Sequence, residues 1–354
     1  MQPHFQTWRE WRGSPTGTRL TDEQEVFRVE PAQSKPKPAL ERKPAWLKVR
    51  APGGEKYTKV KQTLRGLGLH TVCEEARCPN VGECWSHGTA TVMILGDTCT
   101  RGCRFCAVNS GNPRGVVDRS EPEHVARAIA GLGLKYVVLT MVDRDDLPDG
   151  GADHVAQTVR ALHDVQPGLL VETLVGDFAG RPDDIATVLQ AKPEVFAHNI
   201  EVVRRLTPLV RDRRCTYERS LEVLAEAKRF GASRYVKSSL MVGVGETDGE
   251  VTQTLRDLRR VGVDIVTLGQ YLRPSEKHLA VQSYRTPEEF EGWQQQGMDM
   301  GFAFVASGPL VRSSYHAAEA FVAAVGEGSA EAEVAAGVPE IAGIVPTARL
   351  VRGR

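Results

Sequence analysis

Three cysteines with CxxxCxxC spacing, Cys99, Cys103 and Cys106, lie within one short segment of the sequence. Thiolates this close together can ligate three corners of a cubane iron-sulfur cluster and leave the fourth iron open to a ligand from outside the chain. The alternative is a zinc site or chance clustering, but structural zinc sites usually bring four ligands, and this segment has three cysteines. The spacing therefore predicts an iron-sulfur cluster with one open iron.

A second cysteine triad, Cys73, Cys78 and Cys84, lies immediately upstream with CxxxxCxxxxxC spacing. Taken alone, these irregular spacings fit redox-active thiols or a buried cluster of small residues equally well. The chain begins without the apolar core of an export signal, so we expect a cytoplasmic protein whose clustered cysteines bind metal rather than form disulfides. Cys215 stands alone and is interpreted as an ordinary small residue.

The bulk composition argues against two classes of partner. Lys plus Arg and Asp plus Glu number 45 each, so no overall field attracts nucleic acid. The sequence contains no run of 18 apolar residues, so it predicts no membrane-spanning helix. We therefore expect neither nucleic acid nor a membrane among the partners.

The elements that must position the cysteines are predicted from apolar periodicity. β-branched apolar runs alternate with segments of helical period, which is the pattern of βα units and a parallel sheet. Six such units fall short of the eight that close a complete barrel, so the sequence predicts an α/β fold, an open partial (β/α)6 barrel. A further short apolar run, 302–308, follows them, and Ser120 with Glu123 predicts a capping box. Cys99 follows the first predicted strand, 89–97, at the strand end where such folds carry their chemistry.

Longer motifs carry a resemblance to a known family. Phe105, directly before Cys106, completes the CxxxCΦC pattern of the radical S-adenosylmethionine superfamily, whose cofactor binds the open iron. Several segments resemble the lipoyl synthase family in order and spacing, over about residues 44–317: VCEEARCPNVGECWSHGTATVMILGDTCTRGCRFCAV, TMVDRDDLPDGGADH, FAHNIEVVRRLTPLVR, LMVGVGET and GPLVRSSYHA.

The resemblance implies two 4Fe-4S clusters and a reaction. The CxxxCxxC triad would hold the cluster that binds S-adenosylmethionine, and the second triad would hold an auxiliary cluster together with one serine of the RSSY motif, Ser314 by position or else Ser313. The implied enzyme inserts two sulfur atoms, at C6 and C8, into an octanoyl chain carried on a protein lysine. It uses two S-adenosylmethionine molecules per lipoyl group, and the auxiliary cluster donates the sulfur.

The composition of the two ends and the same resemblance together divide the chain, and the resemblance also implies partners. We expect an extended or partly disordered arm at 1–44, an auxiliary-cluster segment at 45–90, the partial barrel closed by the RSSY motif at 91–319 and a flexible tail at 320–354. The implied partners are octanoylated lipoyl-carrier domains, such as the acyltransferase subunit of a 2-oxoacid dehydrogenase or the glycine-cleavage H protein. A low-potential electron donor and a cluster-rebuilding iron-sulfur carrier are implied as well.

Residues near the predicted strand ends are candidates for cofactor contacts. Met241, Gly243 and Glu246 resemble the GxIxGxxE segment that packs against adenine in the superfamily, with Ser239 in place of its first glycine. Phe105 is a further candidate for a cofactor contact, by its place in the cysteine motif.

Asn199 and Glu201 alternate with Ile200, so both side chains should face the same side of a strand, where they could contact cofactor or substrate. A solvated strand end is the alternative. The charged run 143–146 is interpreted as a solvated loop, although its place after the second strand makes it worth testing, and His198 as structural.

Two rival functions remain on sequence grounds. A biotin-synthase-like sulfur inserter would share the CxxxCxxC loop, but it should not combine the upstream triad with a terminal RSSY. A non-catalytic electron carrier would need the clusters but no cofactor pocket.

Overall fold

The computed structural model describes residues 43–48, 53, 58, 61–62, 71, 78, 80–86, 89–314 and 317. All of them belong to Lys43–Arg354, the second of two compact units into which the chain divides. Cys73, the predicted tail and all but the last two residues of the predicted arm lie outside the described residues. None of the described helices is long and apolar enough to cross a membrane.

Seven parallel strands form the main sheet, in which they lie side by side in chain order. They are β1 (Thr89–Ile94), β4 (Tyr136–Met141), β5 (Leu170–Leu174), β6 (Val195–Ala197), β7 (Tyr235–Val242), β8 (Ile265–Gln270) and β9 (Phe304–Gly308). Within the described chain β1 and β9 do not pair, so the sheet is open and the predicted partial barrel is confirmed. The seventh strand, β9, is the short apolar run after the six predicted units, and it pairs with β8.

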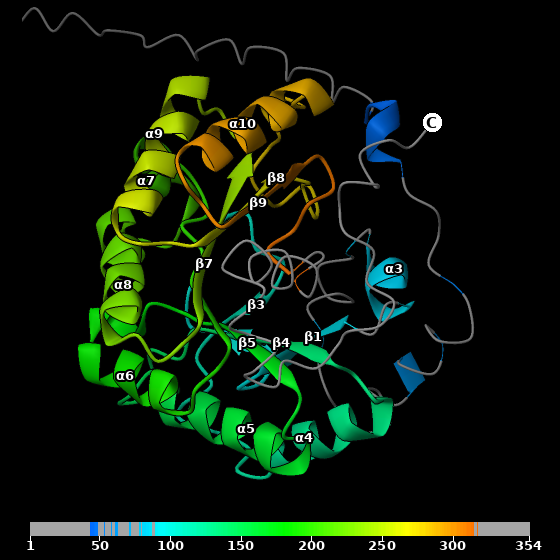
Figure 1. The fold of residues 1–354 in the computed structure, drawn as a ribbon, viewed down its shortest axis with the longest axis vertical. Helices are drawn as coiled ribbons and strands as arrows, with labels where there is room; N and C mark the ends of the chain where they lie inside the picture. The colour runs from blue at the N-terminus through cyan, green and yellow to red at the C-terminus, as the bar shows by residue number, and fades with distance from the viewer. Residues whose placement is uncertain are drawn as a thin grey trace, which may run out of the picture. The chain divides into compact units, whose positions relative to one another are not determined.

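Helices cover one face of this sheet, as parallel crossover connections require (Figure 1). They are α4 (Glu121–Leu132), α5 (Ala152–Val165), α6 (Pro182–Gln190), α8 (Tyr217–Phe230), α9 (Asp248–Arg260) and α10 (Pro287–Asp299). The main apolar core lies between the helices and the strands, and it includes Val137 and Leu139 of β4. Val137 and Leu139 face the helices, so the residues that alternate with them along β4 face the opposite side of the sheet.

The other face of the sheet, here called the inner face, has its own apolar cluster. Tyr136, Val138, Leu170 and Val195 pack there with Ala317, which follows the RSSY motif and is 1% exposed. The chain that carries the motif therefore returns to the inner face after β9.

Helix ends follow local chemistry, with one correction. Thr247 at α9 and Thr286 at α10 each form a complete capping box. The box predicted at α4 is wrong, because the Ser120 hydroxyl donates to Asp118 (2.6 Å) and makes no cap bond to the helix backbone.

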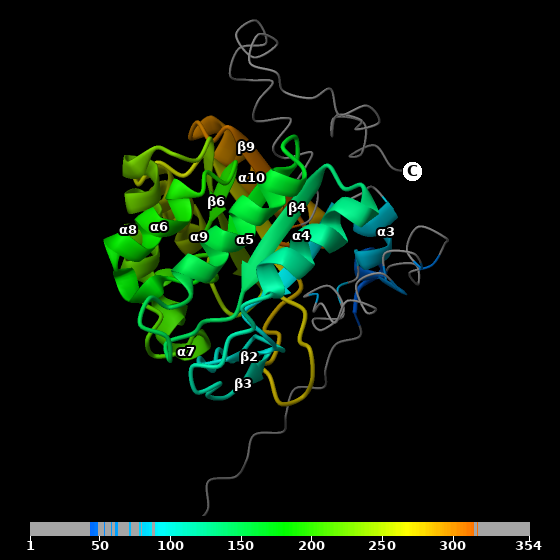
Figure 2. The ribbon, with the colours of Figure 1, turned by 90° about the horizontal axis from the view of Figure 1, so that it is seen from below.

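Small elements gather at the carboxyl ends of the strands. β2 (Thr98–Cys99) pairs with β3 (Asn109–Ser110), and Figure 2 shows both at one end of the sheet with α7 (Thr207–Val210). Other short elements in the described part of the chain are η1 (Ala45–Leu47), α3 (Val81–Ser86), η2 (Phe178–Gly180) and η3 (Arg204–Leu206). The cysteine motif thus lies where the sequence predicted it.

Candidate iron-sulfur site

The CxxxCxxC loop is fixed by hydrogen bonds from three separate parts of the chain. The Thr100 N–H donates to the carbonyl of Asp143, just after β4, at 2.9 Å. The Arg104 N–H donates to the carbonyl of Val210 in α7, also at 2.9 Å. The Leu279 N–H, on the loop after β8, donates to the Arg104 carbonyl at 2.9 Å. The loop is therefore held by the fold and does not depend on its own turns alone.

The three thiols of this loop are half-buried, and backbone amides point at two of them. Cys99 Sγ accepts the Arg101 N–H at 3.4 Å, and Cys103 Sγ accepts the Asp212 N–H at 3.3 Å. Amide donors of this kind stabilise ligating thiolates, so the donor set and its surroundings fit an iron-sulfur cluster. Among the described residues, no three His, Cys, Asp or Glu side chains lie close enough together to hold a single metal ion.

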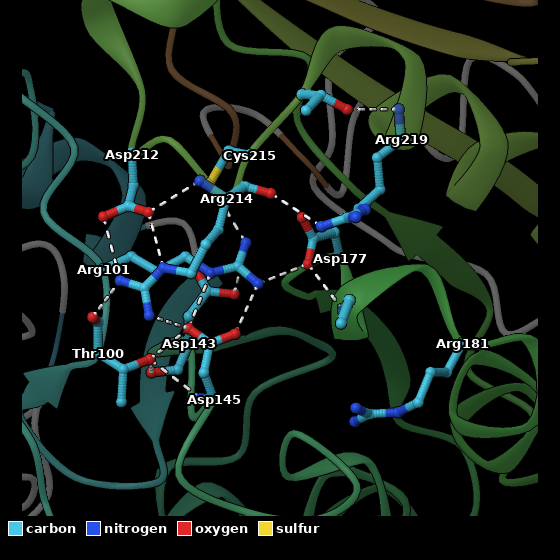
Figure 3. A network of polar contacts seen from close by, with 12 residues as sticks. Thr100, Arg101, Asp143, Asp145, Asp177, Arg181, Asp212, Arg214, Cys215 and Arg219 are labelled. Carbon is cyan, nitrogen blue, oxygen red and sulfur yellow. Dashed lines mark hydrogen bonds and ion pairs between the residues drawn. The ribbon is translucent and has the colours of Figure 1, made fainter. Parts of the chain in front are cut away.

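Arg101 lies inside the loop, and its guanidinium binds side chains from three other segments of the chain (Figure 3). Its Nη2 donates to Asp177 at 2.6 Å and to Asp145 at 2.9 Å, and its Nε donates to Asp145 at 3.1 Å. Arg101 and Asp177 are both almost fully buried. Because a buried guanidinium needs compensating acceptors, these carboxylates fix both its position and the loop around it.

Cys215 belongs to this site, so its interpretation as an ordinary small residue is wrong. It is 4% exposed, and its sulfur accepts Arg101 Nη1 at 3.2 Å. The neighbouring Cys215 thiol, with burial adding to the effect, raises the pKa of Cys103, and the Cys103 thiol lowers the pKa of Cys215 to about 7. The sequence separation of more than a hundred residues hid the contact from sequence reasoning.

The charged run after β4 is also not the solvated loop that its composition suggested. Arg144 is 2% exposed and donates to the carbonyls of Leu95 (3.1 Å) and Val116 (2.8 Å). It also donates to Asp146, and this hydrogen bond lowers the pKa of Asp146 to about 2. Together with Asp145, which binds Arg101, the run anchors the cysteine loop to the end of β4.

Asn199 and Glu201 come together beyond the end of β6, as expected for residues on the same side of the chain. Asn199 Nδ2 donates to Glu201 Oε1 at 3.1 Å, and burial raises the pKa of Glu201. The φ of Glu201 is 67°, a strained left-handed value for a residue that is not glycine. Both residues are half-buried, so neither side chain is fully exposed to solvent.

The segment that resembles GxIxGxxE forms the end of β7 and the turn after it. Glu246 is 5% exposed, and its carboxylate accepts the N–H groups of Gly243 (2.7 Å) and Val244 (3.0 Å) and Nε of Arg285 (3.2 Å). A Cβ on Gly243, whose φ is 93°, would lie 2.1 Å from Gln270 Nε2. Glu246 and Gly243 therefore shape this turn.

The other two candidates for cofactor contacts, Met241 and Phe105, lie in different places. Met241 is half-buried and alternates with Ser239 and Lys237, whose ammonium contacts Glu172 on the inner face, so it faces the same side. Ser239, in place of the family glycine, lies in the extended β7, where it needs no special conformation. Phe105 packs against the edge of the main core.

The second triad is only partly described, since Cys73 lies outside the described residues. Cys78 precedes α3 and Cys84 lies within it, and both side chains are half-buried. Asn80 Nδ2 donates to the carbonyl of Leu310 at 2.7 Å, and the charge of Arg312 acts on the Cys78 thiol. The upstream cysteine segment and the RSSY segment therefore meet.

The RSSY segment itself is held against the inner face. A Cβ on Gly269 of β8 would lie 2.0 Å from the Val311 carbonyl oxygen, so only glycine permits this approach. Arg312 Nη1 donates to the carbonyl of Gln270 at 3.2 Å. Ser313 and Ser314 follow in a half-buried turn.

Sequence reasoning missed Asp177 and the Arg214–Asp212 pair, in which Arg214 Nε donates to Asp212 at 2.8 Å. Asp177 follows β5 directly, and charged residues just after strands were the available indication. The partner of Asp177 could not be deduced, because its contact with Arg101 joins two different strand ends.

Comparison with known proteins agrees with this geometry. The model of the radical S-adenosylmethionine superfamily matches residues 93–258, which contain the CxxxCxxC loop and four complete strands of the main sheet. Together with the open parallel sheet, this defines the chain as a radical S-adenosylmethionine enzyme. The model of the N-terminal domain of lipoyl synthase matches residues 18–78.

Individual relatives are closely similar. The lipoyl synthase of Sorangium cellulosum is 62% identical over 294 residues, 79% of either chain. That of Thermus thermophilus is 55% identical over 92% of this chain and 99% of its own, and the mitochondrial lipoyl synthase of Drosophila pseudoobscura is 54% identical over 80% and 77%. The chain belongs to the lipoyl synthase family, whose members are sulfur-inserting enzymes.

The family implies a 4Fe-4S cluster, S-adenosylmethionine and a protein-bound octanoyl substrate. Among solved structures, the FeFe-hydrogenase maturase HydG of Carboxydothermus hydrogenoformans is 12% identical, with a TM-score of 0.48 over 75% of this chain and 78% of its own.

Proposed function

We propose that this chain inserts two sulfur atoms, at C6 and C8, into an octanoyl chain carried on a lysine of another protein. When bound, the cluster on the CxxxCxxC triad supplies the electron that cleaves S-adenosylmethionine to methionine and the hydrogen-abstracting 5′-deoxyadenosyl radical, and an auxiliary cluster supplies the sulfur. The meeting of the upstream cysteine segment with the RSSY segment, through Asn80 and Leu310, carries this proposal. A radical enzyme that inserts no sulfur does not require these two segments to meet.

The auxiliary ligands in this proposal are Cys73, Cys78, Cys84 and Ser314. The inner-face position of Val311 supports the assignment, because it brings the serine turn to the side of the sheet on which Met241 lies. A serine oxygen is a harder ligand than a thiolate and binds iron-sulfur clusters less tightly. This weaker bond suits a cluster that is dismantled as it gives up sulfur.

The chain's own residues would fix the geometry of the reaction. The Arg101 contacts hold the cysteine loop at the strand ends, and Asn199, Glu201 and Met241 offer contacts to cofactor or substrate. Glu246 and Gly243 shape the turn after β7, and Phe105 packs against the main core. Rigid placement matters because hydrogen abstraction depends on the position of two carbon atoms in turn.

The substrates and partners follow from this chemistry. The enzyme would hold two 4Fe-4S clusters and would use two S-adenosylmethionine molecules for each lipoyl group. The carriers would be lipoyl domains of 2-oxoacid dehydrogenase acyltransferase subunits or the glycine-cleavage H protein, in the cytoplasm. A low-potential donor would supply electrons, and an iron-sulfur carrier would rebuild the auxiliary cluster.

The first test separates the two clusters. In an anaerobic assay with an octanoyl-lysine peptide, the Cys103→Ala variant should lose S-adenosylmethionine cleavage and keep roughly half of the wild-type iron. Deoxyadenosine and the thiolated peptides are followed by mass spectrometry. A folded variant that has lost all its iron would contradict two independent sites.

The second test identifies the sulfur donor. Enzyme whose clusters carry a heavy sulfur isotope is mixed with unlabelled S-adenosylmethionine and octanoyl peptide, and both product sulfurs should be heavy. Ser314→Cys should stall the reaction at or before the first insertion, because a thiolate holds the fourth iron more firmly. Ser313→Ala is the matched control. Light sulfur in the product would exclude the auxiliary cluster as donor, and unchanged yield in Ser314→Cys and Ser314→Ala would exclude this ligand.

A further inference from the structure

Exposed basic side chains from three segments surround the CxxxCxxC loop. Arg104 lies within the loop, Arg213 follows α7, and Lys277 lies on the loop after β8, and all three are exposed. Leu209 of α7, an apolar side chain, lies among them and is 56% exposed. These four residues are here called the basic rim.

The three segments lie side by side because the cysteine loop is hydrogen-bonded to both of the others. Arg104 Nη1 donates to the Leu209 carbonyl at 3.1 Å, and the Gly102 N–H donates to Asp212 at 2.9 Å. On the other side, the Leu279 N–H donates to the Arg104 carbonyl at 2.9 Å. Figure 2 shows α7 and the loop after β8 (gold) on either side of β2 and β3. The basic rim therefore lies around the cysteine loop, at the carboxyl ends of the strands.

The charges of the basic rim are not neutralised by the described part of the chain. Arg213 and Lys277 form no ion pair there, and the Arg104 guanidinium binds a backbone carbonyl and no carboxylate. Of the carboxylates next to them in sequence, Asp212 already pairs with another arginine, and Glu276 is exposed. Because basic and acidic residues number 45 each in the whole chain, this excess of positive charge is a local feature. Such a local field attracts a surface of opposite charge.

The proposed reaction brings a second protein to this end of the sheet. The octanoyl chain is carried on a lysine side chain, so the carrier must come against the residues around the cysteine loop for the chain to reach the reacting centre. An acylated lysine is a neutral amide and cannot itself respond to charge. Attraction and orientation must therefore come from other residues on the surface of the carrier.

We propose that the basic rim is the docking surface for an acidic face of the octanoyl-carrying protein, with Leu209 packing against an apolar side chain of that carrier. This inference rests on the proposed function, since it requires the substrate to be carried on a protein. Complementary charge at the edge of an interface mainly speeds association and fixes the orientation of the partners. The basic rim thus selects the carrier and has no part in the radical chemistry.

The test compares two substrates of the reconstituted, full-length holoenzyme: an octanoylated lipoyl domain and a short octanoyl-lysine peptide without acidic residues. In the double variant Arg213→Glu/Lys277→Glu, the dissociation constant for the domain, measured by calorimetry at low ionic strength, should rise roughly tenfold. Added salt should reduce the difference from the wild type, because it screens exposed charges. Formation of thiolated products from the peptide should be unchanged.

Matched variants on α5, which lies among the helices that cover the sheet, serve as controls. Arg160→Glu reverses an exposed charge there and should leave the affinity for the domain unchanged. Leu209→Ser should weaken binding of the domain, whereas Val165→Ser, which truncates a side chain that is 50% exposed, should not.

The outcomes separate this inference from the proposed function. If the wild type converts neither the domain nor the peptide to thiolated products, the proposed function fails and the inference fails with it. If the wild type converts the peptide but does not bind the domain, only the role of the basic rim is refuted. The same holds if the double variant binds the domain as tightly as the wild type does, if it loses conversion of the peptide as well, or if Arg160→Glu weakens binding equally.

Discussion

His198 should make the stability of the protein fall in mild acid. Its Nδ1 lies 2.9 Å from the Val175 carbonyl, which can only accept, so Nδ1 carries the proton of the neutral ring. Its Nε2 lies 2.9 Å from Ser220 Oγ, which already accepts Arg211 Nη1 at 2.7 Å and therefore donates its own proton to the ring. A second ring proton would break this chain of hydrogen bonds.

The size of the effect follows from the pKa. Burial, with the charge of Arg211 adding to it, lowers the pKa of His198 to about 4 from the ordinary value of 6.5. The unfolded chain then takes up a proton near pH 6.5, whereas the folded protein does so only near pH 4. The stabilisation is complete above pH 6.5 and is lost as the pH falls towards 4, by about 3 kcal/mol in the free energy of unfolding.

The assay compares urea unfolding of wild type and His198→Gln, both without clusters, at several pH values between 7 and 4. The free-energy difference between the two proteins should change by about 3 kcal/mol across this window. NMR of ¹³C-labelled histidines identifies the His198 resonance by its absence in the variant. Titration of that resonance near pH 6.5, or equal pH dependence of both proteins, would refute the reasoning.

Three further expectations follow from the described contacts and the sequence. Lys237→Met should lower the free energy of unfolding by about 3–5 kcal/mol, because it leaves the buried Glu172 unpaired, and adding Glu172→Gln should restore most of the loss in the same urea assay. Gly243→Ala should lower the melting temperature and weaken S-adenosylmethionine binding measured by calorimetry, since its Cβ would collide with Gln270. A normal affinity would contradict the placement of this turn. Deleting residues after 320 should leave lipoyl formation largely intact, and loss of activity in a well-expressed truncation would assign the tail a role.

Local patterns predicted the fold and the position of the cysteine loop, because both depend on residues close in sequence. Apolar runs alternating with helices specify a parallel sheet, and a loop just after a strand must lie at its carboxyl end. The capping box at Ser120 failed for a local reason as well, since the hydroxyl, which would have to accept a backbone N–H of the helix, donates to Asp118 and makes no cap bond. A sequence pattern does not decide which of two nearby partners a hydroxyl binds.

The side-chain network around the loop could not be predicted, because it joins residues from different strand ends. Arg144 looked like part of a solvated run, and Cys215 looked like an ordinary small residue. Their burial depends on which carbonyls and thiols the fold brings near them. The family resemblance did not supply this information either, since Cys215 has no counterpart in the motifs.

There is a structural reason for an arginine at position 101, between the first two cysteines of the motif, and the cysteine spacing alone does not show it. Nε and Nη2 face carboxylates after β4 and β5, and Nη1 faces the Cys215 sulfur after α7, so one planar side chain ties together three separate segments. A lysine could supply the charge but has no fork with which to bind all of these acceptors. The loop needs such rigidity because its cysteines must hold a charged cluster in a fixed position relative to the substrate. The residues between the cysteines therefore do as much to define the site as the ligands themselves.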